Sequence, residues 1–133
     1  MLRAALLLLL TAQPARPCET ALLLSIDVSG SIDAGASRLQ TEGLASALSD
    51  PEVAEALVAG QVAAVQWSGT QAQAFVLPWQ RMLSDPDVTR FAARAAALPR
   101  AFSGSDTAVG QALRFATAQF AAVPLNLMGE GGC

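Results

Sequence analysis

The sequence predicts a single domain of the α/β class, in which helices cover a β-sheet. An uninterrupted apolar run at residues 21–26 is typical of a strand buried on both faces. Two further segments resemble strands. Between and after the three strand-like segments lie stretches with capping residues and with apolar residues at helical spacing. The chain has 133 residues, of which 53% are hydrophobic and 14% charged, so it can form one core and is not a disordered chain.

The first half of the chain is expected to contain a strand, two helices and a second strand. Asp27 ends the first strand, and Asp33 caps a helix over residues 34–49. Asp50 followed by Pro51 starts a short helix that ends at Gly60, and residues 62–67 form the second strand. The side chains expected to face inward on the first helix are Ala36, Leu39, Leu44, Ala47 and Leu48.

The second half is expected to add a hairpin strand and two helices. Residues 72–77 form a third strand after a turn at 68–70, and Pro78 favours the end of that strand or an edge position. A helix starts at the Ser84-Asp85-Pro86-Asp87 signal, and a last helix spans residues 107–122. The side chains expected to face inward on these two helices are Val88, Phe91, Ala92, Ala95, Leu98, Val109, Leu113, Ala116 and Phe120.

Residues 1–17 are typical of a signal peptide with cleavage near residue 15, although a buried N-terminal element is the alternative. We therefore expect an exported protein, periplasmic or secreted, with no membrane span after cleavage. The domain would occupy residues 18–123, followed by an irregular tail at 124–133. Export permits a disulfide between Cys18 and Cys133, but the sequence leaves their pairing open.

The composition excludes several classes of function. The chain has no histidine and only two cysteines, which argues against the usual Ser-His-Asp and Cys-His catalysis and against most zinc sites. All eight basic residues are arginines, and they are scattered, whereas a nucleic-acid-binding protein needs a basic stripe. A bound metal would have to be a hard cation held by oxygen ligands.

Three oxygen-bearing side chains alternate directly after the first strand, at Asp27, Ser29 and Ser31. This spacing lets them converge on one point, and one carboxylate with two hydroxyls is a partial shell for a divalent cation. Mg²⁺ is the first expectation, with Mn²⁺ and Ca²⁺ as alternatives. The simpler interpretation is a turn whose polar side chains cap the next helix.

The pattern Asp27-Val28-Ser29-Gly30-Ser31 resembles the metal-ion-dependent adhesion site of von Willebrand factor type A (vWA) domains. The segment from Thr107 to Leu113 resembles the second element of that site. The resemblance implies a partial, doubly wound, Rossmann-like fold, with a mostly parallel sheet, an antiparallel edge hairpin and helices on both faces. It also implies that Ser29, Ser31 and Thr107 contact the metal while Asp27 anchors the site, and that the module is a non-enzymatic one that captures an acidic group of a protein partner. The sequence does not predict the oligomeric state.

Residues 18–113 also resemble a bacterial group of exported vWA-like proteins classed as a domain of unknown function, through 21–33, 66–69, 78–79 and 102–110. The chain departs from the vWA pattern because no further strand followed by an aspartate comes after the last helix. The first strand, which is central in that family, would then expose an apolar edge. A truncated or frameshifted, non-functional fragment is therefore one alternative. A hydrolase or phosphatase is another, although Ser29 stands where aspartyl phosphatases carry a second acid.

Overall fold

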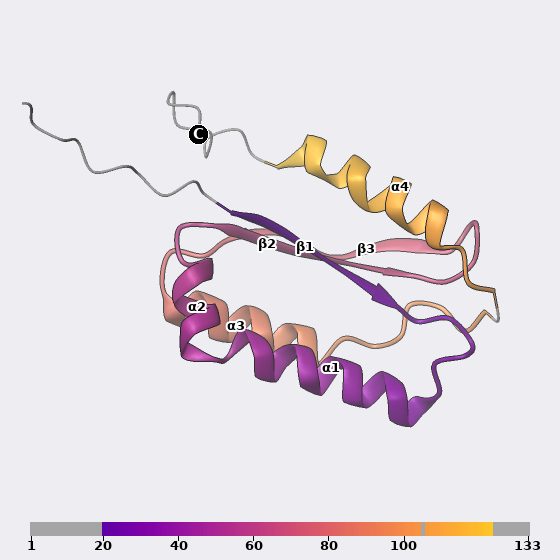
Figure 1. The fold of residues 1–133 in the computed structure, drawn as a ribbon, viewed down its shortest axis with the longest axis horizontal. Helices are drawn as coiled ribbons and strands as arrows, with labels where there is room; N and C mark the ends of the chain where they lie inside the picture. The colour runs from indigo at the N-terminus through magenta and orange to yellow at the C-terminus, as the bar shows by residue number, and fades with distance from the viewer. Residues whose placement is uncertain (1–19, 105, 124–133) are drawn as a thin grey trace, which may run out of the picture.

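The computed structural model of the chain describes residues 20–104 and 106–123. The expected signal peptide, the expected tail and both cysteines lie outside these residues. The described part consists of three layers, in which a sheet is covered on one face by α1, α2 and α3 and on the other by α4 (Figure 1). The predicted α/β class and the order of the elements are confirmed.

The sheet has three strands in the order β1-β2-β3, namely Ala21–Asp27, Gln61–Trp67 and Gln73–Arg81. β1 pairs with β2 in parallel, from Ala21 opposite Gln61 to Asp27 opposite Trp67, whereas β2 and β3 form an antiparallel hairpin. Every residue of β2 is buried, because neighbouring strands and helices enclose it on all sides. β2 is therefore the centre of the fold, and β1 and β3 are the edges of the described sheet.

Pro78 lies inside β3, so the prediction that it ends the strand was wrong, whereas the prediction of an edge position is confirmed. The β2–β3 register shifts on both sides of Ala64, and Pro78 falls in the first of these irregular stretches. A proline has no N–H to donate to a ladder, so an irregular stretch of an edge strand can accommodate it. The strand then continues to Arg81.

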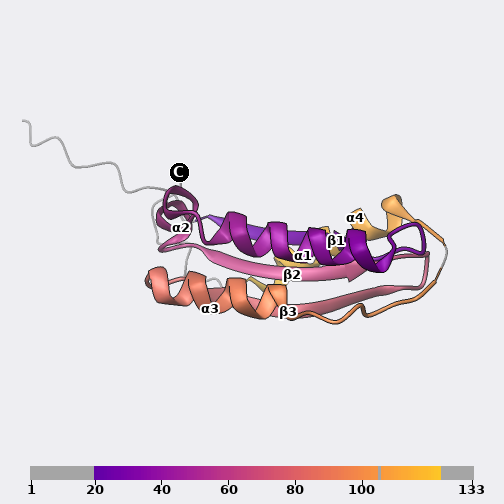
Figure 2. The same cartoon turned by 90° about the horizontal axis from the view of Figure 1, so that it is seen from below.

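The first face of the sheet is covered by α1 (Ala34–Leu48), α2 (Pro51–Leu57) and α3 (Asp85–Ala96). Figure 2, seen from below, shows α1 and α3 side by side in front of the strands. The predicted caps of α1 and α2 are confirmed, since Asp33 accepts a hydrogen bond from the N–H of Ala36 at 2.8 Å and Asp50 from that of Glu52 at 2.9 Å. Of the five side chains expected to face inward on α3 and after it, four are buried and Leu98 is half-buried.

The inward face predicted for α1 was partly wrong. Leu48 is buried and Leu44 half-buried, but Ala36 and Ala47 are exposed and Leu39 is 68% exposed. Thr41 is buried instead, because its hydroxyl is satisfied by the carbonyls of Ser37 and Arg38 at 3.2 and 3.0 Å. A polar side chain that hydrogen-bonds its own helix can face the core, so apolar spacing alone did not place this helix.

The second face is covered by α4 (Val109–Gln119) and the short 3-10 helix η1 (Phe120–Ala122). Only Ala112 and Ala116 of α4 are buried, so of the four expected inward positions only Ala116 is confirmed. The others, Val109, Leu113 and Phe120, are 53%, 61% and 44% exposed. The two buried side chains of α4 are alanines, whose small size allows the helix to lie close to the sheet.

Two contacts fasten the end of α4 to β3. The indole N–H of Trp79 donates a hydrogen bond to the carbonyl of Gln119 at 3.0 Å, and its ring packs against Phe120 with centroids 5.3 Å apart. Trp79 therefore acts in packing. No helix within the described ranges is long and apolar enough to cross a membrane.

Candidate metal centre

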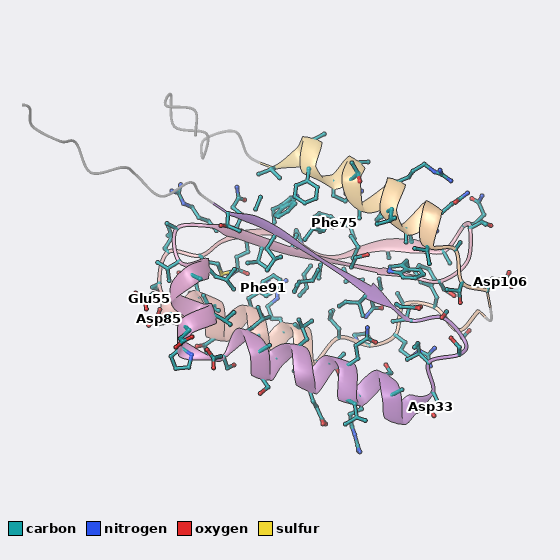
Figure 3. All side chains as sticks on the ribbon, in the orientation of Figure 1. Asp33, Glu55, Phe75, Asp85, Phe91 and Asp106 are labelled. Carbon is teal, nitrogen blue, oxygen red and sulfur yellow. The ribbon has the colours of Figure 1, made fainter. Side chains whose placement is uncertain are left out.

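The candidate site lies where β1 ends. Because β1 and β2 are parallel, their carboxyl ends meet at one edge of the sheet, and the N–H of Val28 still donates to the carbonyl of Trp67 at 2.9 Å. This is the end of the molecule at which Asp33 and Asp106 are labelled in Figure 3. Carboxyl ends of strands are the usual place for ligand sites in α/β sheets.

Asp27, Ser29 and Ser31 are joined by hydrogen bonds in a short loop. The backbone N–H of Ser29 donates to Oδ1 of Asp27 at 2.7 Å, and the hydroxyls of Ser29 and Ser31 lie 3.2 Å apart. Ser29 is fully buried, Asp27 is half-buried and Ser31 is exposed. Three of the predicted site residues therefore lie together in one loop, with their exposure increasing from Ser29 through Asp27 to Ser31.

The loop is closed by a turn and by an arginine from a distant segment. The N–H of Ile32 donates to the carbonyl of Ser29 at 2.9 Å. The guanidinium of Arg100 donates from Nη2 to the carbonyls of Val28 and Ser29 at 2.8 and 3.0 Å. Sequence reasoning missed Arg100, because in a chain whose basic residues are all arginine nothing in the composition distinguishes this one.

Residues 97–104 and 106–108, here called the connector, lie between α3 and α4 along the carboxyl ends of β1 and β2. The N–H of Ala101 donates to the side-chain Oε1 of Gln66 at 2.7 Å. The buried hydroxyl of Ser68 donates to the carbonyls of Gly104 and Asp106 at 3.2 and 2.9 Å. Ser68 therefore acts as a structural donor that fixes the connector to the end of β2.

Thr107, the fourth predicted site residue, lies in the connector and is exposed. Its neighbours are held by Ser68, since the carbonyl of Asp106 accepts from the Ser68 hydroxyl and the N–H of Ala108 donates to the Ser68 carbonyl at 2.9 Å. Within the described residues, no hydrogen bond joins Thr107 to Asp27, Ser29 or Ser31. The structure thus brings three of the four residues together and places Thr107 at the same end of the sheet.

Because Gly69 has no side chain, the connector can lie close to the turn that follows β2. A Cβ at this position would lie 3.2 Å from the Cβ of Asp106, which is tighter than ordinary van der Waals contact. An open pocket of about 270 Å³ lies beside this contact and does not include Asp27, Ser29 or Ser31. Its lining consists of residues 68–72, Gly104 and Asp106.

The chemistry of the Asp27–Ser31 loop fits a hard cation. Oxygen atoms at neighbouring positions around an octahedral Mg²⁺, each at about 2.1 Å from the ion, are about 3.0 Å apart. The 3.2 Å between the Ser29 and Ser31 hydroxyls is close to that separation. Within the described residues no group of three His, Cys, Asp or Glu side chains is placed to hold a metal, so any such centre would rely on hydroxyl oxygens.

Comparison with known families gives one match. The sequence matches a family described as "Protein of unknown function (DUF1194)" over residues 17–128, which includes the Asp27–Ser31 loop, Arg100 and Thr107. No curated protein matches the chain.

Proposed function

The chain belongs to the DUF1194 family, and from the geometry at the end of β1 we propose that it is an exported binding module that captures an acidic group of a protein partner through a divalent cation. Asp27, Ser29 and Ser31 would hold the cation, and Thr107 is the candidate for a distal ligand. The resemblance of residues 27–31 to the vWA adhesion motif supports this proposal. Mg²⁺ is the proposed ion, with Mn²⁺ or Ca²⁺ as alternatives.

The observation that carries the proposal is the convergence of the Asp27–Ser31 loop. One oxygen of the Asp27 carboxylate orients the Ser29 amide at 2.7 Å, and no hydrogen bond within the described residues uses its other oxygen, Oδ2. Ser29 is fully buried, and the hydroxyl of Ser31 is the one partner of its hydroxyl among the residues that the structure describes. Hydroxyl ligands are neutral, so a bound cation would keep positive charge with which to attract a carboxylate from outside.

The first test is calorimetric titration of Mg²⁺ and Mn²⁺ into the wild-type chain and the Ser29→Ala variant. We expect saturable binding to the wild type, weakened at least about ten-fold in the variant because a direct oxygen ligand is lost. Ser46→Ala, an exposed serine near the far end of α1, is the matched control and should bind like the wild type. Absence of binding to the wild type, or equal binding by Ser29→Ala, would contradict the proposal.

The second test concerns the acidic group. With Mn²⁺ present, an acetylated and amidated tripeptide with a central glutamate should shift the water-proton relaxation rate, because its carboxylate would displace water from the ion. The same peptide with glutamine in place of glutamate is the control. If the two peptides act alike, the cation does not capture carboxylates, even if it binds.

A further inference from the structure

Arg100 is the one side chain from outside the Asp27–Ser31 loop that binds the backbone of that loop within the described residues. It lies in the connector, about seventy residues away in sequence, and a single nitrogen, Nη2, donates to the carbonyls of Val28 and Ser29. Hydrogen bonds from a charged donor are roughly twice as strong as neutral ones. The carbonyl of Ser29 accepts a second hydrogen bond, from the N–H of Ile32.

The two carbonyls that Arg100 binds belong to the two peptide groups on either side of Ser29. The peptide between Val28 and Ser29 is planar, and its N–H binds Asp27 while its carbonyl binds Arg100. This peptide is therefore held at both of its polar ends. The following peptide is held through the Ser29 carbonyl. Fixing both planes sets the direction of the Cα–Cβ bond of Ser29, and the contact of its buried hydroxyl with that of Ser31 then selects the rotamer about this bond.

We propose that Arg100 is a positioning residue for the metal centre, and that it sets the cation affinity by orienting the Ser29 hydroxyl toward that of Ser31. This inference rests on the proposed function. Groups that orient a ligand without touching the ion commonly change metal affinity about 10–100-fold when removed. Through Arg100, the position of the connector also determines the geometry of the loop.

The charge of Arg100 acts in the opposite direction, because a guanidinium repels a nearby cation. Arg100 is exposed to solvent, which screens this repulsion, whereas the orientation of a buried hydroxyl is a matter of tenths of an ångström. Positioning should therefore outweigh repulsion. Two substitutions separate these effects, since Arg100→Lys keeps the charge and a donor, and Arg100→Gln removes the charge.

The experiment measures Mn²⁺ affinity and the amide exchange rate of Ser29 by NMR in the wild type, Arg100→Lys and Arg100→Gln. We expect Arg100→Gln to weaken Mn²⁺ binding about ten-fold and to speed exchange of the Ser29 amide, with Arg100→Lys restoring most of both. Arg90→Ala is the matched control, because Arg90 pairs with Asp87 within α3, a helix that begins at the opposite end of the molecule, where Asp85 is labelled (Figure 3).

The outcomes separate this inference from the proposed function. If the wild type binds Mn²⁺ and Arg100→Gln binds it equally or more tightly, Arg100 does not position the site and the inference fails alone. If the wild type binds no Mn²⁺, the proposed function fails, and the inference fails with it. If Arg100→Gln weakens Mn²⁺ binding but leaves the exchange of the Ser29 amide unchanged, Arg100 does not act by orienting Ser29, and the inference fails.

Discussion

Two phenylalanines show how differently the two faces of the sheet are covered. Phe91 of α3 lies between the sheet and the helices of the first face and is 1% exposed, whereas Phe75 of β3 lies on the α4 side and is 37% exposed (Figure 3). The first face is covered by three helices that contribute side chains such as Leu48, Leu57 and Val88. Within the described residues the second face is covered by α4 and the short η1, whose buried residues are Ala112 and Ala116 of α4.

The difference shows that the burial of a sheet face depends on the size of the helix side chains that point toward it, as well as on the presence of a helix. Alternate residues of β2 point to opposite faces, so Val62 and Ala64 face the core beneath α1, α2 and α3, while Ala63, Val65 and Trp67 face the α4 side. On the first face large side chains interdigitate into a core. On the second, the alanines of α4 bring its backbone close to the sheet but bury little apolar area, so the first face should supply most of the stability.

The largest expected effect is on the first face. Phe91→Ala should lower the free energy of unfolding by about 3–5 kcal/mol, because it leaves a cavity in a core that encloses the ring completely. Phe75→Ala is the matched control, and its loss should be much smaller because part of that ring is already in water. Urea denaturation of both variants measures the difference. Equal losses would show that the two faces contribute equally.

A smaller effect is expected where α4 meets β3. Trp79→Phe removes the indole donor to the Gln119 carbonyl but keeps an aromatic ring beside Phe120, so the loss should be about 1 kcal/mol. Thermal unfolding followed by circular dichroism measures it. A melting temperature unchanged from the wild type would mean that this hydrogen bond does not hold α4 on the sheet.

The smallest effect is expected on the outer side of α4. Leu113 is 61% exposed, so Leu113→Gln should change the free energy of unfolding by no more than about 0.5 kcal/mol. Urea denaturation provides the test, with Ala116→Gln as the comparison that should be clearly destabilising because Ala116 is buried. A loss above about 1 kcal/mol for Leu113→Gln would show that this side chain is covered in solution.

The sequence predicted where helices and strands lie better than it predicted which side chains of each helix face the sheet. Asp33 and Asp50 gave the starts of α1 and α2 because side-chain capping is a local interaction that depends on few neighbours. The inward side chains of α1 and α4 were misassigned at Leu39 and Leu113, because alanines surround both helices with apolar positions and leave the periodicity ambiguous. On α3, where polar and apolar residues are clearly segregated, the inward face was predicted correctly.

The part of the candidate site that was predictable from the sequence is the part formed by residues close together in the chain. Asp27, Ser29 and Ser31 lie within five residues, and the structure joins them as their spacing suggested. Arg100 and Ser68 were not predicted as parts of its support, because both act through backbone carbonyls that are distant in sequence. Such contacts depend on the position of the connector relative to the strands, and no sequence pattern predicts that position. The metal itself and the part of Thr107 remain predictions.

The parallel pairing of β1 with β2 has a consequence for folding order. Ala21 lies opposite Gln61, about forty residues away in sequence, whereas β2 and β3 are joined by a short turn. Loop-closure entropy makes the short-range hairpin the earlier event and the docking of β1 the later one. The Asp27–Ser31 loop follows β1, and Arg100 reaches it only after the connector has crossed the ends of β1 and β2. We therefore expect the Asp27–Ser31 loop to be assembled late in folding, on a hairpin that is already formed.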